Sequence, residues 1–449
     1  MRENRIIVEP FHFQNYLEFE SIKEFNTHGI LKIRGLIADR DVDTYERLAA
    51  NELWVCVKII DENENVRIFF RGLLTWWEVE KNNGGNILSI ELHTGTFLLD
   101  IETHVRSFQQ SAMLFVDVIE QCLEKSDSKF FIYDKRDTRI HQFLLQFQET
   151  DWEFLLRLAA NAGTVLIPEY TMKGKNFYFG YPQRDREIEI DSNEYKIIRN
   201  SGERKEMYVI DLREVYDLGE IVRFRNRKLM ISKIITYLNG SELYHKYYLV
   251  AAESRQYASK MNKKIKGVSL LAKVVQIQNT CVQVEIQSDE NKEKSGYKWF
   301  NYATIYSTPD GTGWYCMPEV GDTVRIVFPD EDENNAYVMS SVHLEAEEAR
   351  NNPDHKSWKN RQNKEILFTP DSLVIRNNKG LAVELSDQKG IVITSDKNIS
   401  LNADKNINLT SCNSNITVNA DSSLSLVQGC ARIDMDDTIN IAGGKIFMN

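Results

Sequence analysis

The sequence lacks the features that mark membrane-spanning, secreted and nucleic-acid-binding proteins. No run of about 18 apolar residues is present, so no segment is predicted to cross a bilayer as a helix. The first residues, MRENRIIVEPFHF, carry charges with no apolar core behind them, so we expect no secretory signal and synthesis in the cytoplasm. The formal net charge is -11. This acidity argues against nucleic acid or an anionic membrane as the main partner, because both attract clustered Lys and Arg.

Recognisable catalytic and metal-binding motifs are also missing. The six cysteines contain no C-x-x-C pair, so we expect buried reduced thiols rather than a disulfide framework or a zinc site. No G-x-S-x-G, H-E-x-x-H, P-loop or G-x-G-x-x-G motif occurs. The eight histidines do not cluster, and His104 and His141 are expected at the surface or a boundary. We therefore predict no catalytic residue, no metal and no cofactor, and a protein that is not an enzyme.

Two further patterns have ordinary structural interpretations. Asp330-Glu331-Asp332-Glu333-Asn334 is acidic enough to suggest calcium, but it lacks the Gly and the terminal Glu of an EF-hand loop. We interpret it as the solvated tip of a hairpin. Asn398, Asn408 and Asn415 each begin a glycosylation sequon, and we interpret them as turn residues of the repeat described below.

Strand-like sequence is present in two blocks of the first 250 residues. Runs rich in β-branched and aromatic residues are separated by turn signals such as Asn82-Asn83-Gly84-Gly85. The predicted strands are 30–37, 53–60, 66–76, 86–94, 206–212, 220–224, 229–238 and 243–251. We predict two β-barrel halves, at residues 1–100 and 176–267, around a helical and hairpin insertion at residues 101–175.

The insertion is predicted to contain two helices and a hairpin. Apolar residues recur at helical spacing over residues 106–125; these are Phe108, Ala112, Phe115, Ile119, Cys122 and Leu123. In the second helix Thr150 is the predicted N-cap, Glu153 completes a capping box, and Gly163 ends the helix. A hairpin follows at residues 164–180, turning at Lys173-Gly174-Lys175. A short basic helix closed by Gly267 is predicted at residues 253–267.

A small barrel is predicted next. Five strand-like runs occur between Leu271 and Val342, at residues 271–278, 281–287, 300–308, 322–329 and 336–342. Five short strands in about 75 residues are typical of a small Greek-key barrel such as the OB-fold, here residues 268–343. The polar residues 344–364 are predicted to be a linker.

The final segment, residues 365–449, is a short-period repeat. Pairs of apolar residues two apart recur about every six to ten residues, with Asn, Asp, Ser, Lys and Gly between them. The pairs are Leu373/Ile375, Leu381/Val383, Ile391/Ile393, Ile399/Leu401, Ile407/Leu409, Ile416/Val418, Leu424/Leu426, Ile433/Met435, Ile439/Ile441 and Ile446/Met448. Each unit reads as a strand of about four residues with one apolar side, followed by a polar turn.

Three architectures fit this repeat. A single-chain solenoid usually needs coils of about 20 residues, and an ordinary sandwich is a further alternative. A step near eight residues fits better if each chain supplies one face per level and three chains wind together. In that trimeric, triple-stranded β-helix the apolar residues face neighbouring chains, so folding and trimerisation are coupled. The fold class is thus mainly β, with a small helical insertion, a β-barrel hub, an OB-fold and a C-terminal β-helix.

The order of these segments resembles the VgrG spike family, the hub-spike proteins of type VI secretion, extracellular contractile injection systems and contractile phage tails. Three segments carry the resemblance. The first is similar to a family motif of the form E-T-D-x-x-F-L-x-R-L; its residues here are Gln148, Glu149, Thr150, Asp151, Phe154, Leu155, Arg157, Leu158 and Gly163. The second is the end of the OB domain, a turn and a closing strand; its residues here are Pro318, Val320, Gly321, Asp322 and 338–342. The third is SDKNISLNADKNINLTS within the repeat.

The resemblance implies a structural role. A homotrimer would carry two barrel-like hub halves per chain, and these would adapt the sixfold tail tube to a threefold needle. Its partners would be tail tube and baseplate proteins. The needle would touch the target membrane transiently as it punctures the envelope. Such a protein is assembled in a contractile injection particle, and it is released or translocated with it.

The C-terminal end is the one predicted contact site for another protein. Some family spikes bind iron there through His-x-His, but INIAGGKIFMN contains no His, so we predict no apical metal. We expect a PAAR-like tip protein or an effector to cover Ile446, Phe447, Met448 and Asn449, since Phe447 and Met448 would otherwise expose apolar side chains. A self-closed end is the alternative.

A trimeric receptor-binding fibre or tailspike is the alternative function. A tailspike that cleaves polysaccharide needs paired carboxylates and exposed aromatic residues in a groove. After Phe368 the repeat contains only one aromatic residue, Phe447, which disfavours sugar binding there.

Overall fold

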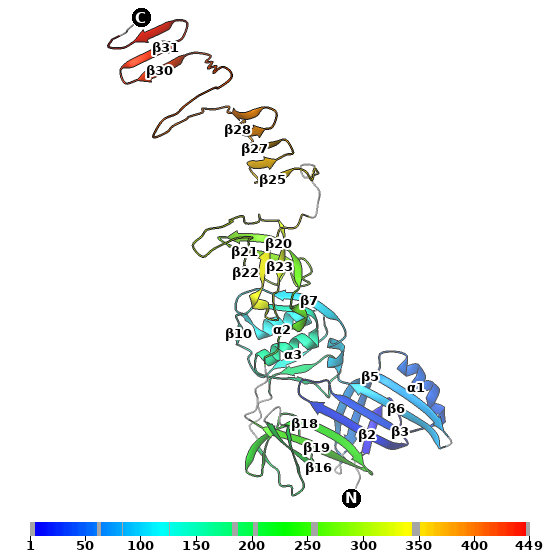
Figure 1. The fold of residues 1–449 in the computed structure, drawn as a ribbon. Helices are drawn as coiled ribbons and strands as arrows, with labels where there is room; N and C mark the ends of the chain where they lie inside the picture. The colour runs from blue at the N-terminus through cyan, green and yellow to red at the C-terminus, as the bar shows by residue number, and fades with distance from the viewer. Residues whose placement is uncertain are drawn as a thin grey trace. The chain divides into compact units, whose positions relative to one another are not determined.

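The computed structural model describes residues 5–60, 64–82, 84–124, 126–181, 187–200, 205–252, 259–343 and 351–445. The chain forms two compact units, Met1–Leu344 and Glu345–Asn449. Strands dominate both units (Figure 1). No helix in the described ranges is long and apolar enough to cross a membrane. All six cysteines are free thiols.

A twelve-stranded sheet forms the first part of the N-terminal unit. Its strands follow the order β1-β4-β5-β6-β3-β2-β18-β19-β16-β15, with β17 beside β18 and β14 beside β17. Their bounds are β1 Arg5–Glu9, β2 Asn15–Glu24, β3 Ile30–Ile37, β4 Trp54–Ile60, β5 Val66–Asn82, β6 Gly85–His93, β14 Glu187–Glu189, β15 Lys196–Asn200, β16 Lys205–Leu212, β17 Ile221–Phe224, β18 Arg227–Asn239 and β19 Glu242–Ala251. Side chains alternate between buried and exposed along β3, as expected for a strand with one face in a core.

The two predicted barrel halves share this sheet. β2 from the first half pairs antiparallel with β18 from the second, with Lys233 opposite Glu24 and Tyr237 opposite Glu20. One hydrophobic core contains residues of both halves, including Leu31, Phe70 and Tyr247. The eight strands predicted in these segments are all present. The structure adds β1, β2, β14, β15 and two helices that the sequence analysis did not predict, namely η1 Asp39–Asp41 and α1 Val42–Ala49.

The insertion contains two helices and several short strands packed around a second core. Its elements are η2 Gly95–Leu99, β7 Thr103–Phe108, β8 Met113–Leu114, α2 Phe115–Leu123, β9 Phe130–Ile132, β10 Arg139–Ile140, β11 Leu144–Thr150, α3 Asp151–Asn161, β12 Leu166–Pro168 and β13 Phe177–Phe179. Helix α3 begins and ends as predicted. Thr150 Oγ1 accepts a hydrogen bond from the Glu153 amide, the Glu153 carboxylate accepts one from the Thr150 amide, and Gly163 has a φ of 70°.

The first predicted helix is shorter than expected. Phe108 lies on β7 opposite Leu144 of β11, so the start of the predicted helix is a strand. Ala112 has a φ of 62°, a left-handed conformation that a helix interior excludes. Helix α2 begins only at Phe115, where the Asp117 carboxylate accepts the amide hydrogen of Leu114 at 3.1 Å. The hairpin predicted at residues 164–180 is present as β12 paired with β13.

A five-stranded barrel with the OB topology closes the N-terminal unit. Its strands are β20 Ser269–Gln278, β21 Cys281–Ile286, β22 Trp299–Asn301, β23 Thr323–Val327 and β24 Tyr337–Met339, in the order β22-β21-β20-β23-β24. A parallel bridge between Tyr302 and Val338 joins the two edge strands, which closes the sheet on itself. The predicted strand at residues 300–308 is shorter, because the chain leaves the barrel after Ala303.

The helix predicted at residues 253–267 is absent from the described part of this segment, residues 259–267. Residues 253–258 lie outside the described ranges, and the remainder contains only a 3-10 turn, η3 Lys263–Ile265. Gly267 does end this segment with a φ of 76°. A second 3-10 turn, η4 Glu333–Asn335, lies between β23 and β24.

The C-terminal unit consists of two antiparallel sheets and an extended segment between them (Figure 1). The first sheet has strands β25 Lys356–Lys359, β26 Glu365–Phe368, β27 Ser372–Arg376, β28 Ala382–Ser386 and β29 Gly390–Thr394. The second has β30 Leu424–Gln428, β31 Ala431–Met435 and β32 Ile439–Ala442. β25 lies inside the predicted linker, so this part of the prediction was wrong. The strand was missed because its sequence is polar except for Trp358, which lies opposite Ile366.

Burial of one histidine makes the stability of the sheet depend on pH. His245 on β19 is 2% exposed and its Nδ1 lies 2.8 Å from Thr236 Oγ1. Burial, helped by the positive charges of Arg67 and Lys23, lowers its pKa from 6.5 to about 4.

We expect the sheet to lose stability as the pH falls below 6.5. The unfolded chain binds a proton at His245 below its ordinary pKa, whereas the folded chain does so only near pH 4, so acid favours unfolding. This one residue should cost about 2 kcal/mol between pH 7.5 and 5. Urea unfolding of the natural chain and of His245→Asn checks this. Equal pH dependence in the two proteins would contradict it.

Candidate functional site

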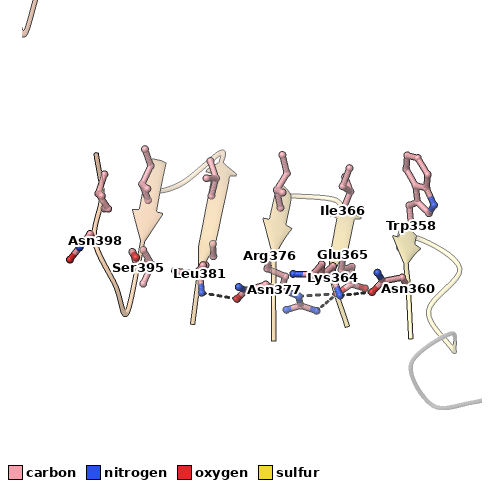
Figure 2. A pocket seen from close by; sticks show the side chains of 16 residues that line it. Trp358, Asn360, Lys364, Glu365, Ile366, Arg376, Asn377, Leu381, Ser395 and Asn398 are labelled. Atoms are coloured by element: carbon pink, nitrogen blue, oxygen red, sulfur yellow. Dashed lines mark hydrogen bonds and ion pairs between the residues drawn. The ribbon is translucent and has the colours of Figure 1, made fainter. Parts of the chain in front are cut away.

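The first sheet of the C-terminal unit carries a continuous apolar face. Because strand register places every second residue on one side, two rows of large side chains run across the strands. One row is Trp358, Ile366, Ile375, Val383 and Ile393, and the other contains Phe368, Leu373, Leu385 and Ile391. Many of these side chains are open to solvent, with Ile391 at 72% and Ile393 at 57%. Figure 2 shows the shallow groove that the first row lines.

Polar turn residues border this face. Asn360 Oδ1 accepts the amide hydrogen of Lys364 at 3.0 Å, and Asn377 Oδ1 accepts that of Leu381 at 3.0 Å. Arg376 and Glu365 form an ion pair on the same edge (Figure 2). The Asn-rich turns thus satisfy their own backbone groups, as predicted, and leave the strands uniform.

The segment between the two sheets has no backbone partner among the residues that the structure describes. Residues 396–423 are all exposed, and no backbone–backbone hydrogen bond joins any of residues 395–423 to another described residue. The apolar pairs continue through it: Ile399 is 57% exposed, Leu401 69%, Ile407 52% and Leu409 71%. Unpaired N–H and C=O groups beside exposed apolar side chains are a costly combination for a chain that stands alone. The three sequons at Asn398, Asn408 and Asn415 lie in this segment.

The second sheet repeats the pattern of the first. Leu426 lies opposite Ile433, and Ile433 opposite Ile441, so one apolar row again crosses all three strands. Ile441 is 56% exposed. The described part of the C-terminal unit therefore does not coil back to cover its own apolar face. The predicted tip contact, residues 446–449, lies outside the described residues.

In the N-terminal unit, buried ion pairs connect the insertion to the OB barrel. We call this contact the joint, and Arg157 of α3 lies at its centre. Its guanidinium donates to both carboxylate oxygens of Glu149 at 2.8 Å and to Glu333 at 2.8 Å. All three side chains are at most 8% exposed. Burial alone lowers the pKa of Arg157, but the hydrogen bond to Glu149 and the charge of Glu333 more than offset this and raise it.

Glu333 corrects an expectation from the sequence. Its acidic stretch was interpreted as a solvated hairpin tip, whereas Glu333 is 5% exposed and paired with Arg157. The neighbouring Asn334 accepts the amide hydrogen of Phe143 at 3.0 Å. The stretch therefore fastens the OB barrel to the insertion. No group of His, Cys, Asp or Glu suited to a metal ion occurs in the part of the chain that the structure describes.

A second set of contacts at this joint has no obvious signal in the sequence. Asp289 accepts the amide hydrogen of Ser107 at 3.0 Å, and Asn291 donates to the Ser107 carbonyl at 3.1 Å. Arg106 pairs with Asp151, a residue of the E-T-D motif. These partners are 45 to 184 residues apart along the chain, so no local pattern could reveal them.

Residues of the E-T-D motif and of the OB turn support the fold through ion pairs, a helix cap and a tight turn. Glu149, Thr150, Asp151 and Arg157 build the joint and the cap of α3, as described above. In the OB turn, Gly321 has a φ of 95° and donates to the Val274 carbonyl at 2.8 Å. Phe154, Leu155 and Leu158 of the first motif pack into the core of the insertion, whereas Val320 of the second is 52% exposed.

Three histidines lie beside acidic groups, namely His28, His93 and His104. His93 Nε2 is 2.8 Å from the Glu91 carboxylate. His104 Nδ1 is 2.9 Å from Glu290 at the edge of the joint. His28 lies between Thr96 Oγ1, at 2.9 Å, and Asp100, at 3.3 Å, which superficially resembles a nucleophile, base and acid. Thr96 is fully buried, so its hydroxyl cannot reach a substrate in solution. His141 is exposed.

Removing the central cation of the joint should destabilise the N-terminal unit strongly. Arg157→Met leaves Glu149 and Glu333 buried without a counter-charge, and such losses typically cost about 3–5 kcal/mol. Calorimetry of the full chain measures this loss. The matched control is Arg223→Met, because Arg223 pairs with Glu187 at 2.9 Å on the surface and is 54% exposed; its loss should leave the stability nearly unchanged, because water screens an exposed ion pair. Similar effects of the two substitutions would contradict the role of the joint.

Comparison with known proteins found one matching family model and several solved structures with a similar fold. Residues 270–343 match the family model of the type VI secretion system/phage-baseplate injector OB domain. The search of curated proteins found no match. Among solved structures, the Escherichia coli c3393 protein is described as a component of the type VI secretion system with structural similarity to the T4 bacteriophage tail proteins gp27 and gp5. It has a TM-score of 0.51 at 13% identity over 76% of this chain and 100% of that chain.

Two Francisella structures agree with this result. The lidded PdpA-VgrG complex has a TM-score of 0.58 at 9% identity, over 88% of this chain and 80% of that chain. The lidless complex has a TM-score of 0.55 at 8% identity, over 87% and 98%. At these identities the likeness concerns the fold, which resembles that of VgrG proteins, and residues 270–343 form an OB domain of the type VI secretion and phage-baseplate kind.

Proposed function

We propose that the chain is the central spike of a contractile injection system and works as a homotrimer. The observation that carries the proposal is the C-terminal unit, which exposes one apolar face and leaves residues 395–423 without backbone–backbone hydrogen bonds to other described residues. A partner must supply both apolar contacts and strand hydrogen bonds at a regular spacing. Other copies of the same repeat supply both in register.

Three chains can satisfy these demands in two ways along one needle. Where a chain forms its own sheet, at β25–β29 and β30–β32, three sheets turn their apolar faces toward a common axis. Where a chain has no internal pairing, at residues 395–423, its strands pair with those of the other two chains. Burial of each Leu, Ile or Val side chain contributes about 1.5–3 kcal/mol, so the many exposed apolar residues give assembly a large driving force.

The resulting needle suits a passive mechanical role. Stacked strands with short polar turns leave few mobile loops, and closed sheets have no free edges. The force for puncture comes from the contracting particle, so the spike needs no catalytic residue, metal or cofactor. In this proposal, residues 1–100 and 176–267 form the hub that contacts tail tube and baseplate proteins and adapts their sixfold arrangement to the threefold needle.

The remaining partners follow from the same role. A PAAR-like tip protein or an effector covers residues 446–449, and the needle meets the target membrane only during puncture. The protein is assembled into an injection particle without needing nucleic acid.

A charge placed on the apolar side of the unpaired segment should prevent assembly. Ile407→Asp brings three carboxylates into the needle core, and each costs several kcal/mol to bury. Asn408→Asp is the matched control, because it introduces the same charge at the adjacent residue, which faces the opposite side of an extended chain. Light scattering of the full chain should give three times the chain mass for the natural protein and Asn408→Asp, and a smaller mass for Ile407→Asp.

The same pair of variants tests the place of the protein in a particle. Images of purified particles should show density on the axis beneath the tube with Asn408→Asp and none with Ile407→Asp. Density at the periphery would instead indicate a receptor-binding fibre. A natural chain that remains monomeric would contradict the trimer.

A further inference from the structure

An ordered hairpin projects from the OB barrel between β22 and β23. We call residues 304–316 the arm. The amide of Trp314 donates to the Tyr306 carbonyl at 2.8 Å, and the amide of Thr308 to the Thr312 carbonyl at 2.9 Å. The side chain of Asp310 accepts the amide hydrogen of Thr312 at 2.9 Å and fixes the tip. A bridge between Ser307 and Gly313 makes the arm a true two-stranded hairpin.

Gly313 shows that the arm is a tightly built structure. Its φ is 138°, and a Cβ there would lie 2.4 Å from the Tyr306 carbonyl oxygen. At the base, the Tyr315 hydroxyl donates to the Asn279 carbonyl at 3.0 Å, and Thr304 Oγ1 donates to the Trp314 carbonyl at 3.1 Å. The backbone of the arm is therefore held in place before any partner binds.

The large side chains of the arm are nevertheless exposed on both of its faces. Ile305 is 94% exposed, Tyr315 72%, Tyr306 51% and Trp314 51%. Successive cross-strand pairs of a hairpin point to opposite sides, so Tyr306 and Trp314 lie on one face and Ile305 and Tyr315 on the other. Tyr, Trp and Ile held on a rigid support are the usual anchors of a protein interface.

Charge indicates what the arm contacts. The chain has a net charge of -11 and 27% charged residues, yet residues 302–318 contain only one charged residue, Asp310 at the tip. Two copies of an acidic protein repel each other, so a contact between them requires uncharged surfaces. The arm is such a surface.

The length of the connection between the OB barrel and the C-terminal sheet also favours a second copy of this chain as the partner. β24 ends at Met339 and β25 begins at Lys356. At about 3.3–3.6 Å per residue, this connection holds each OB barrel within roughly 60 Å of the start of its own C-terminal sheet. Three chains joined through that sheet therefore keep their OB barrels at an effective concentration on the order of millimolar.

We propose that the arm of each chain packs against the OB barrel of a neighbouring copy in the trimer. This inference rests on the proposed trimeric spike and adds a second contact between the copies, separate from the needle. Three such contacts form a collar that keeps the OB barrels from separating when the needle meets resistance.

Hydroxyl-radical footprinting of the full chain tests the arm, because oxidation of aromatic rings reports their exposure to solvent. We expect Trp314 and Tyr315 to be oxidised about tenfold more slowly in the natural trimer than in the Ile407→Asp chain, as expected for burial in an interface core. Asn408→Asp should behave like the natural chain.

A mixture of light and ¹⁵N-labelled chains identifies the partner. With photoreactive benzoylphenylalanine in place of Tyr315, cross-linked peptides should join the arm of one isotope to residues 268–343 of the other. Cross-links within one chain only, or a trimer whose arm is oxidised as fast as in the Ile407→Asp chain, would overturn the arm proposal and leave the trimer standing. A natural chain that is monomeric would overturn both.

Discussion

The missing backbone hydrogen bonds of residues 395–423 are the constraint on which the rest of this account depends. Extended chain with unpaired N–H and C=O groups, flanked by sheets with one exposed apolar face, is an incomplete structure. Sheet edges and apolar faces of this kind are closed either by the chain itself or by a partner. The described residues of this chain do not close them, and closing them is the role that we propose for the other two chains of the trimer.

The N-terminal unit differs from the C-terminal unit because it buries its apolar side chains within one chain. Its three hydrophobic cores are complete within one chain. β11 links two of them: Leu144 packs into the core of the insertion, whereas Leu145 and Phe147 pack into that of the OB barrel. The buried Arg157, held by carboxylates from both sides, fixes the two parts in one orientation. A rigid unit of this kind transmits force with little internal movement, as the proposed spike role requires.

Local signals in the sequence predicted local structure well. The capping box of Thr150 and Glu153 located α3, and the two-residue spacing of apolar pairs located β27–β32, since both depend on neighbours along the chain. The same spacing also predicted strands at three pairs between β29 and β30, where the structure has none; these are Ile399/Leu401, Ile407/Leu409 and Ile416/Val418. Errors arose where distant partners decide. Phe108 looked helical but pairs with Leu144, and Glu333 looked solvated but meets an arginine from α3. The union of the two predicted barrel halves into one sheet depends on the pairing of β2 with β18, which no local pattern encodes. The arm was missed for a related reason, because its apolar residues resemble one more barrel strand.

Hydrogen–deuterium exchange of the backbone amides at residues 395–423 in the full chain tests the central claim most directly. If three chains pair there, these amides should exchange at least about a thousandfold more slowly than in an unstructured peptide, since exchange then requires the needle to open. Exchange at the rate of an unstructured peptide, in a preparation at working concentration, would show that the segment has no partner and would contradict the account.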